Sequence, residues 1–120
     1  MTGWRDDRGT TAVEFALVAP FVVMLLVGIM SLSLLLLSAG SMHFATEAAA
    51  RCASARPTVC SDSATTVAYA SSKYFGALIS PVFTYAATAC GNQVSAAAIY
   101  TLNVGMFQRS IDLSATSCFP

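Results

Sequence analysis

The stretch FALVAPFVVMLLVGIMSLSLLLLSAGSM, residues 15–42, decides the fold of this chain. It contains no charged residue and no histidine from Phe15 to Met42. A helix needs about 20 apolar residues to cross the core of a bilayer. The stretch therefore predicts one transmembrane helix, because the rest of a 120-residue chain is too small to bury it as a core helix.

The composition favours a membrane protein over a soluble one. Hydrophobic residues make up 56% of the chain, charged residues make up 10%, and the mean hydropathy is +0.67. Soluble domains carry about 25% charged residues. Six Lys and Arg balance six Asp and Glu, so the chain lacks the basic excess with which nucleic-acid binders neutralise phosphates. Its high hydrophobicity also excludes intrinsic disorder.

A cleaved secretory signal is the alternative interpretation of the same stretch. Signal peptides have an apolar region of about 7–15 residues, followed by small residues at the cleavage site. Ala39, Gly40 and Ser41 could form such a site. The leucine run, however, continues to Leu37 and then passes into another helical pattern, so its length favours a retained span.

The cysteines indicate which side of the membrane the remaining chain occupies. Arginines flank the span on both sides, so the positive-inside rule gives no orientation. All four cysteines follow the span, at Cys52, Cys60, Cys90 and Cys118. An even number in a small domain predicts two disulfides, which persist in an oxidising compartment, and the lack of a CxxC pair disfavours zinc. We expect a cytoplasmic N-terminus, residues 43–120 outside, and no metal or cofactor.

The helix is expected to continue outside the membrane through residues 43–57. This segment is rich in alanine, the best helix former, and Glu47 and Arg51 are spaced for an i,i+4 ion pair. Pro57 should end the helix, and Pro20 should kink it. Small residues recur at every fourth position, at Ser41, Ala45, Ala49 and Ala53. This face could pack on a helix of another subunit or on the chain's own domain, and the pattern favours neither.

Residues 58–120 predict a small α+β domain. Ser63 can cap a short helix over residues 64–75, with Lys73 in its last turn and Gly76 at its end. From Pro81 onward the apolar period changes to two, which predicts three antiparallel strands joined by turns at CGNQ (90–93) and GMFQ (105–108). The expected core positions are Phe83, Tyr85, Ala87 and Ala89, then Val94, Ala96, Ala98, Tyr100, Leu102 and Val104, then Ile111, Leu113 and Ala115.

Two features of this domain leave alternatives open. Strand phase makes Cys52–Cys60 with Cys90–Cys118 the simplest of three possible connectivities, but the sequence does not choose among them. Met106 and Phe107 are unusual residues for the second turn, because loops generally face water. They form a contact with the membrane or a partner subunit, or Phe107 folds back onto the sheet.

Catalytic chemistry has no basis in this sequence. His43 is the single histidine, and we interpret it as an interfacial polar residue because no partner constellation surrounds it. The chain contains no acid pair, nucleophile motif or glycine-rich phosphate loop. We therefore expect a protein that is not an enzyme.

Glu14 stands at the start of the apolar stretch, five residues after Gly9 and a short leader that contains arginines. The string RDDRG-TTAVE-FALVAPFVVMLLVGIM, residues 5–30, resembles the processing region of type IV prepilins. More closely, it resembles the TadE-like proteins of the tight-adherence (Tad/Flp) pilus system, which carry a glycine, four residues and then Glu-Phe before a single hydrophobic helix. The later segments ATEAAARCASA, ACGNQVSAAAIYTL and SIDLSATSCFP also resemble the family's exterior part.

The resemblance implies roles for four residues at the head of the helix. Gly9 would be the last leader residue and Thr10 the first mature one, after cleavage by a prepilin peptidase on the cytoplasmic side. Glu14, the fifth mature residue, and Phe15 would act in assembly. Major Flp pilins are shorter and usually have Tyr after the glutamate, so the resemblance implies a minor pilin or pseudopilin. The acidic pair Asp6 and Asp7 departs from the more basic leader of the family.

The prediction as a whole is an α+β protein with four parts. These are a leader (1–9), a transmembrane helix (10–42), the extension of that helix (43–57) and a disulfide-stapled exterior domain (58–120). The resemblance implies a structural component of Tad pilus assembly in the bacterial inner membrane. Its implied partners are the membrane, other pilin-like subunits, the Tad machinery and the prepilin peptidase. The alternatives are a single-pass periplasmic binding or envelope protein that enters no fibre, and a secreted disulfide protein.

Overall fold

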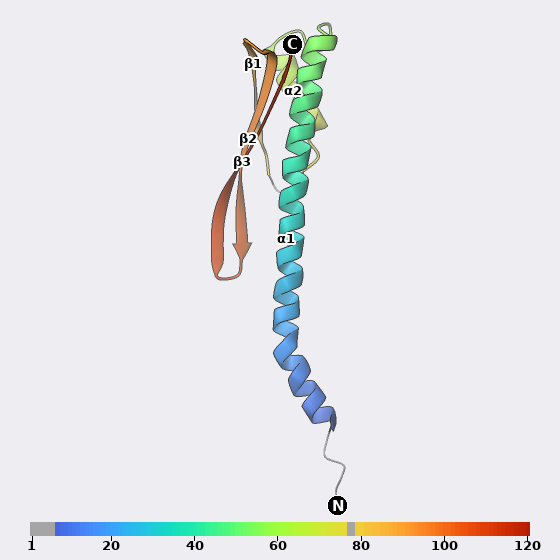
Figure 1. The fold of residues 1–120 in the computed structure, drawn as a ribbon, viewed down its shortest axis with the longest axis vertical. Coiled ribbons are helices and arrows are strands. Elements are labelled where there is room, and N and C mark those ends of the chain that lie inside the picture. Colours follow the sequence, from blue (N-terminus) through green and yellow to red (C-terminus); the bar gives the residue numbers. More distant parts are fainter. Residues whose placement is uncertain (1–6, 77–78) are drawn as a thin grey trace, which may run out of the picture. The chain divides into compact units, whose positions relative to one another are not determined.

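The structure is a computed structural model, and it describes residues 7–76 and 79–120. Its elements follow in the order α1 (Asp7–Ala55), α2 (Ser63–Lys73), β1 (Val82–Thr88), β2 (Gly91–Val104) and β3 (Phe107–Phe119) (Figure 1). The strands form one antiparallel sheet in the order β1-β2-β3. A long apolar helix, a short helix and a three-stranded antiparallel sheet confirm the predicted α+β fold class.

The chain divides into two compact units, residues 1–32 and residues 33–120. The described part of the first unit consists of α1 alone. The second unit contains the rest of α1, together with α2 and the sheet. The helix continues through Pro20 and ends at Ala55, two residues before Pro57. Arg56, which precedes the proline, is therefore outside the helix, as expected for a residue that proline excludes from the α region.

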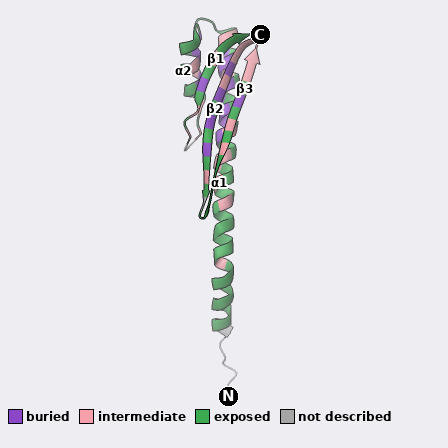
Figure 2. Ribbon diagram, turned by 90° about the vertical axis from the view of Figure 1, so that its left-hand side faces the viewer, coloured by how far each residue is buried: buried purple, intermediate pink, exposed green. Residues whose placement is uncertain are grey.

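The core of the second unit is built largely from alanine. Its buried members are Met42, Ala45, Ala49 and Ala50 of α1, Ala70 of α2, and Phe83, Val94, Ala96, Ala98 and Ala115 of the sheet. Figure 2 shows the buried positions of α1 gathered in its C-terminal part, which we call its outer part (residues 38–55). Ser41, Ala45 and Ala49 of the small-residue ladder are buried. This face of α1 therefore packs within the chain's own domain, which resolves the alternative that the sequence left open.

Hydroxyl groups buried in this core are satisfied by carbonyls of their own helix. The Ser41 hydroxyl donates to the Ser38 carbonyl at 3.1 Å, and the Thr46 hydroxyl donates to the His43 carbonyl at 2.9 Å. In α2, the Thr66 hydroxyl donates to the carbonyl of Asp62 at 2.7 Å. Buried polar groups are costly only when they lack such a partner. Serine and threonine can therefore serve here as small core residues.

Helix α2 begins one residue earlier than predicted. The cap is Asp62 rather than Ser63, because the Asp62 carboxylate accepts from the Thr65 amide at 2.8 Å while the Thr65 hydroxyl accepts from the Asp62 amide at 3.1 Å. This reciprocal arrangement is a capping box with threonine as the third helical residue. The helix ends at Lys73, and Tyr74 already has extended backbone angles. Gly76 does not end the helix; a Cβ there would lie 2.3 Å from the Tyr74 hydroxyl, so glycine admits the tyrosine ring.

The strands show the predicted alternation at their centres. Phe83, the β2 positions Val94, Ala96, Ala98 and Tyr100, and Ala115 of β3 are all buried. The prediction is wrong at the end of β1, where Ala87 and Ala89 are exposed. Ala89 belongs to the turn, and Ala87 is the last core-phase position before that turn.

Two tight turns connect the strands, and each uses glycine with a positive φ. The first turn is Ala89–Cys90, earlier than the predicted CGNQ turn, and Gly91 follows it with φ 125°. A Cβ on Gly91 would lie 2.3 Å from the Phe119 carbonyl oxygen, so no other residue fits there. The second turn is Gly105–Met106, within the predicted GMFQ segment, with φ 61° at Gly105. Glycine at the first central position is typical of two-residue hairpins.

Two disulfides tie the ends of these elements together. Cys52 bonds to Cys60 over a sequence separation of 8, and Cys90 bonds to Cys118 over a separation of 28. The first bridge joins the end of α1 to the loop before α2. The second joins the β1–β2 turn to the end of β3. A core made of alanine buries little area per residue, so such crosslinks supply stability that packing alone does not.

Removal of the longer bridge should cost more stability than removal of the shorter one. Chain-entropy arguments assign about 3.6 kcal/mol to the 28-residue separation and about 2.5 kcal/mol to the 8-residue one. We expect the Cys90→Ala/Cys118→Ala variant to lose about 3–4 kcal/mol, measured by denaturant unfolding of the full chain in detergent. Non-reducing peptide mapping of the parent chain supplies the control. Any pairing other than these two would contradict the account.

The cap of α2 should make the stability of this helix depend on pH. Hydrogen bonds from the Thr65 amide, and then from the Thr65 hydroxyl, hold the pKa of the Asp62 carboxyl below its usual range. A lowered folded-state pKa contributes stability above the unfolded pKa, which is lost as the pH falls below about 4. Asp62→Asn keeps a capping oxygen without a titrating group. The variant should therefore show a flatter acid limb in thermal unfolding than the parent; equal limbs would refute this role for the charge.

Candidate functional site

The residues with predicted roles in processing and assembly lie near the beginning of α1. Gly9, Thr10, Glu14 and Phe15 are all helical and exposed. Helical geometry stacks residues four apart on the same face, so Thr10 and Glu14 lie one turn from each other. Phe15 is adjacent to Glu14 along the chain and is 72% exposed. The first unit therefore places Thr10 and Glu14 on one accessible face of α1.

Helix α1 begins at Asp7, before the predicted boundary between leader and mature chain. The Gly9–Thr10 peptide bond therefore lies in the first turn of the helix. The amides of a first turn have no intrahelical acceptor, and helix ends open most easily. Glycine at position 9 weakens this turn by about 1 kcal/mol relative to alanine.

An uninterrupted apolar surface follows these residues. Every large apolar side chain from Val13 to Met30 is exposed in the structure. Burying one such side chain is worth about 1.5–3 kcal/mol, so the set amounts to tens of kcal/mol, more than the about 5–15 kcal/mol net stability of a typical protein. The helix is long and apolar enough to cross a membrane by length and composition. This surface requires a lipid or protein environment.

The potential cleavage site of a secretory signal, Ala39 to Ser41, lies in the part of α1 that belongs to the second unit. Ser38 and Ser41 flank the potential cleavage site, and both are buried. The helix continues through them without a break to Ala55.

The resemblance rests on one combination of features. A glycine is followed five residues later by a glutamate, and the exposed apolar part of α1 begins there. Residues 9–51 match the family model of TadE-like proteins. The match begins at Gly9 itself and includes Glu14, Phe15 and the whole apolar stretch. It confirms the predicted resemblance to a family of the Tad pilus system over this TadE-like segment. No curated protein and no solved structure matches the chain significantly.

The match ends at Arg51, so α2 and the sheet lie outside the TadE-like segment. The predicted resemblance of the later segments, such as ACGNQVSAAAIYTL, is not part of this match. What the TadE-like segment shares with its family is therefore the part of α1 from Gly9 to Arg51. The disulfide-bonded sheet is described by the structure alone.

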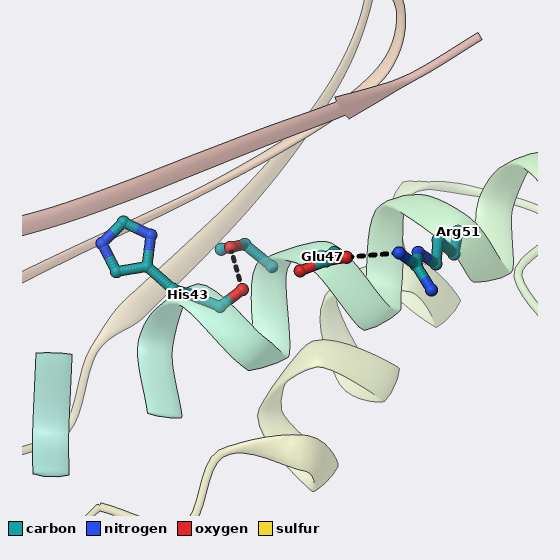
Figure 3. A network of polar contacts seen from close by, with 4 residues as sticks. His43, Glu47 and Arg51 are labelled. Atoms are coloured by element: carbon teal, nitrogen blue, oxygen red, sulfur yellow. Dashed lines mark hydrogen bonds and ion pairs between the residues drawn. The ribbon is translucent and has the colours of Figure 1, made fainter. Parts of the chain in front are cut away.

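The outer end of the TadE-like segment carries polar residues with structural roles. Figure 3 shows His43, Glu47 and Arg51 along α1. Glu47 Oε1 and Arg51 Nη2 are 2.5 Å apart, which confirms the predicted i,i+4 ion pair. His43 is exposed, and its carbonyl accepts the Thr46 hydroxyl. Among residues 7–76 and 79–120, no three His, Cys, Asp or Glu side chains gather as a metal site.

Sequence reasoning missed a set of cation–aromatic contacts around α2. The Arg56 guanidinium lies 5.8 Å from the centre of the Tyr69 ring and donates to its hydroxyl at 3.2 Å. The Lys73 ammonium lies 5.3 Å from the same ring, and Arg51 lies 5.1 Å from the ring of Phe119. The Arg51–Phe119 contact joins α1 to β3, and the Arg56–Tyr69 contact joins the segment after α1 to α2. The Lys73–Tyr69 contact lies within α2, at an i,i+4 spacing.

The predicted contact tip lies at the β2–β3 turn. Met106 is fully exposed and Phe107 is 80% exposed. Phe107 therefore does not fold back onto the sheet. The second unit thus presents two large apolar side chains at the end of its hairpin.

Proposed function

We propose that this chain is a minor pilin-like subunit, or pseudopilin, that acts in the assembly of a Tad-type pilus. The observation that supports the proposal is the TadE-like segment, in which Gly9 and Glu14 precede an exposed apolar helix. In this account the protein is structural rather than catalytic. The part of α1 in the first unit would cross the membrane and bundle with the helices of other subunits. The second unit would form the exterior head.

Processing is the first step of the proposed function. A prepilin peptidase would cleave the Gly9–Thr10 bond on the cytoplasmic side and leave a free amine on Thr10. The reference pKa of such an amine is about 7.7–8.0, so it is largely protonated at neutral pH. Cleavage therefore replaces a neutral amide with a positive charge at the head of the apolar helix.

Glu14 then has a defined electrostatic role. Its carboxylate lies one helical turn from Thr10, and it can neutralise the new amine of its own chain or of a neighbouring subunit. Bundling of apolar helices removes both charges from water. A desolvated charge is costly unless it is paired, so the pair favours helices that align amine with carboxylate.

The exterior head explains why α1 extends beyond the apolar stretch. Its outer part supplies Met42, Ala45, Ala49 and Ala50 to the core of the second unit. The outer part of α1 is therefore part of the exterior head. In the proposed topology the N-terminus is cytoplasmic and the disulfides lie in the oxidising periplasm or outside the cell.

A single-pass envelope protein that enters no fibre is the less favoured alternative. Such a protein needs an apolar span, but its function does not require a carboxylate at the start of that span. A carboxylate there can also remain at the headgroups. The match that begins at Gly9 favours the assembly role, because it joins the glutamate to the processing glycine.

Replacement of Glu14 tests the proposal directly. Glu14→Gln nearly preserves the shape of the side chain and removes its charge, so we expect normal membrane insertion and a strong loss of pili. The matched control is Glu47→Gln, which removes an exposed acid of the same helix whose ion pair with Arg51 contributes at most about 1 kcal/mol. The control should retain piliation. The measurements are membrane fractionation and counts of pili on cells.

Normal piliation in Glu14→Gln cells would contradict the assembly role of the charge. Loss of the protein from the membrane fraction would instead assign Glu14 to targeting.

A further inference from the structure

The sheet of the second unit carries an apolar patch with a carboxylate on the face opposite its core. Ile99 of β2 pairs with Asp112 of β3, so the two side chains lie next to each other on one face, while the alternate residue Ala98 is buried on the other. Val82 of β1 pairs with Ala97 and shares the face of Ile99. Val82 and Ile99 are each 66% exposed. These three residues, Val82, Ile99 and Asp112, line an open depression of about 450 Å³, and we call them the sheet patch.

Asp112 is the side-chain carboxylate of the second unit that the structure leaves without a partner. This unit contains three acidic side chains, of which Glu47 pairs with Arg51 and Asp62 caps α2. Asp112 is exposed and forms no ion pair with the residues that the structure describes. Arg109 is three residues away on β3 and therefore points to the opposite face of the sheet. The sheet patch thus presents an unneutralised negative charge among apolar side chains.

A pocket between α1 and α2 has the complementary chemistry. Its volume is about 250 Å³, and Phe44, Arg56 and Tyr69 are among the residues that line it. Phe44 is 53% exposed and lies 6.1 Å, between ring centres, from Phe75, which is 61% exposed. Lys73 contacts the same Tyr69 ring from α2. We call Phe44, Arg56, Tyr69 and Lys73 the helix pocket.

The cations Arg56 and Lys73 of the helix pocket can each take up a carboxylate. Both lie against the ring of Tyr69, and neither forms an ion pair with an acid in residues 7–76 or 79–120. A guanidinium has five N–H donors, and the hydroxyl of Tyr69 accepts only one bond from Arg56. The remaining donors match the two oxygens of a carboxylate. The helix pocket therefore offers positive charge beside exposed aromatic surface.

We infer that the sheet patch of one copy docks on the helix pocket of a second copy. In this contact Asp112 pairs with Arg56 and Lys73, and Ile99 packs against Phe44. The second copy is the occupant that the charges favour, because each surface carries what the other lacks. The inference goes beyond the proposed function, since it requires neither cleavage of the chain nor a charge at the head of α1.

The two surfaces lie on different sides of the second unit, so one copy cannot close the contact on itself. The sheet patch is on the face that points away from the core. The helix pocket belongs to α1 and α2, which supply Ala45, Ala49 and Ala70 to that core from its other side. Such a contact joins unlike surfaces, so its repetition generates a ring or an open helical filament.

Chemical crosslinking of the full chain in detergent tests this contact. Lys73 is the single lysine of the chain, so a carbodiimide, which joins a carboxylate to an amine without a spacer, has one side-chain amine to use. Chains with natural nitrogen and chains labelled with ¹⁵N are mixed before the reaction. We expect linked peptides that join Asp112 to Lys73, with one light and one heavy half, because the two residues come from different copies. Their yield should fall as salt is raised, since salt screens exposed charges.

A pair of variants that keeps both reacting groups tests the role of charge. Arg56→Gln removes a cation of the helix pocket, and we expect the yield of the Asp112–Lys73 link to fall by about two- to fivefold. The matched control is Arg109→Gln, which removes an exposed arginine from the other face of β3 and should leave the yield unchanged. Peptide mapping of Cys52–Cys60 and Cys90–Cys118 checks that each variant is folded.

Three results would overturn the inference. The first is an Asp112–Lys73 link found only within single chains, and the second is a link between copies that uses Glu47 or Asp62 as often as Asp112. The third is an equal yield from the Arg56→Gln and Arg109→Gln variants, which would assign the cation of the contact to another partner. None of these results depends on processing or on piliation, so a failure here is distinguishable from a failure of the proposed function.

Discussion

The core that the outer part of α1 shares with the sheet is the feature on which the second unit depends. Ser41, Ala45 and Ala49 face the core, and Ala96, Ala98 and Ala115 face it from the sheet. Short side chains therefore line this core from both sides. Local acceptors for the hydroxyls of Ser41 and Thr46 complete this arrangement, because they keep polar atoms in the core satisfied. The result is a thin core that the disulfides reinforce.

The two parts of α1 differ in the size and the burial of their side chains. From Val13 to Met30, α1 carries large apolar side chains on all its faces. From Ser38 onward, small residues dominate its buried face. A helix that is apolar on all sides suits lipid or a helix bundle. A helix with one small-residue face suits a sheet. The junction between the two patterns is therefore the physical boundary between anchor and head.

Much of this architecture could be predicted because the determining signals are local. The apolar stretch, the period of two after Pro81 and the proline at position 57 each act over a few residues, and the structure contains the expected elements. The predicted details that were wrong depend on contacts between side chains. Asp62 rather than Ser63 caps α2, because Thr65 offers it a reciprocal hydrogen bond. The partner of the small-residue ladder and the stacking of Arg56 on Tyr69 required the tertiary structure, since a sequence pattern shows that a face is small without showing what covers it.

The residues with proposed roles show a similar division. Gly9 and Glu14 could be found from the sequence, because their spacing before an apolar helix is a short motif, and the family match begins at that glycine. The exposure of Met106 and Phe107 required the structure. The central claim is that α1 is the helix of a processed pilin-like subunit. Mass spectrometry of the N-terminal peptide of the protein isolated from membranes tests it most directly. The account predicts a mature chain that begins at Thr10; a chain that begins at Met1, or near Gly40 or Ser41, would contradict it.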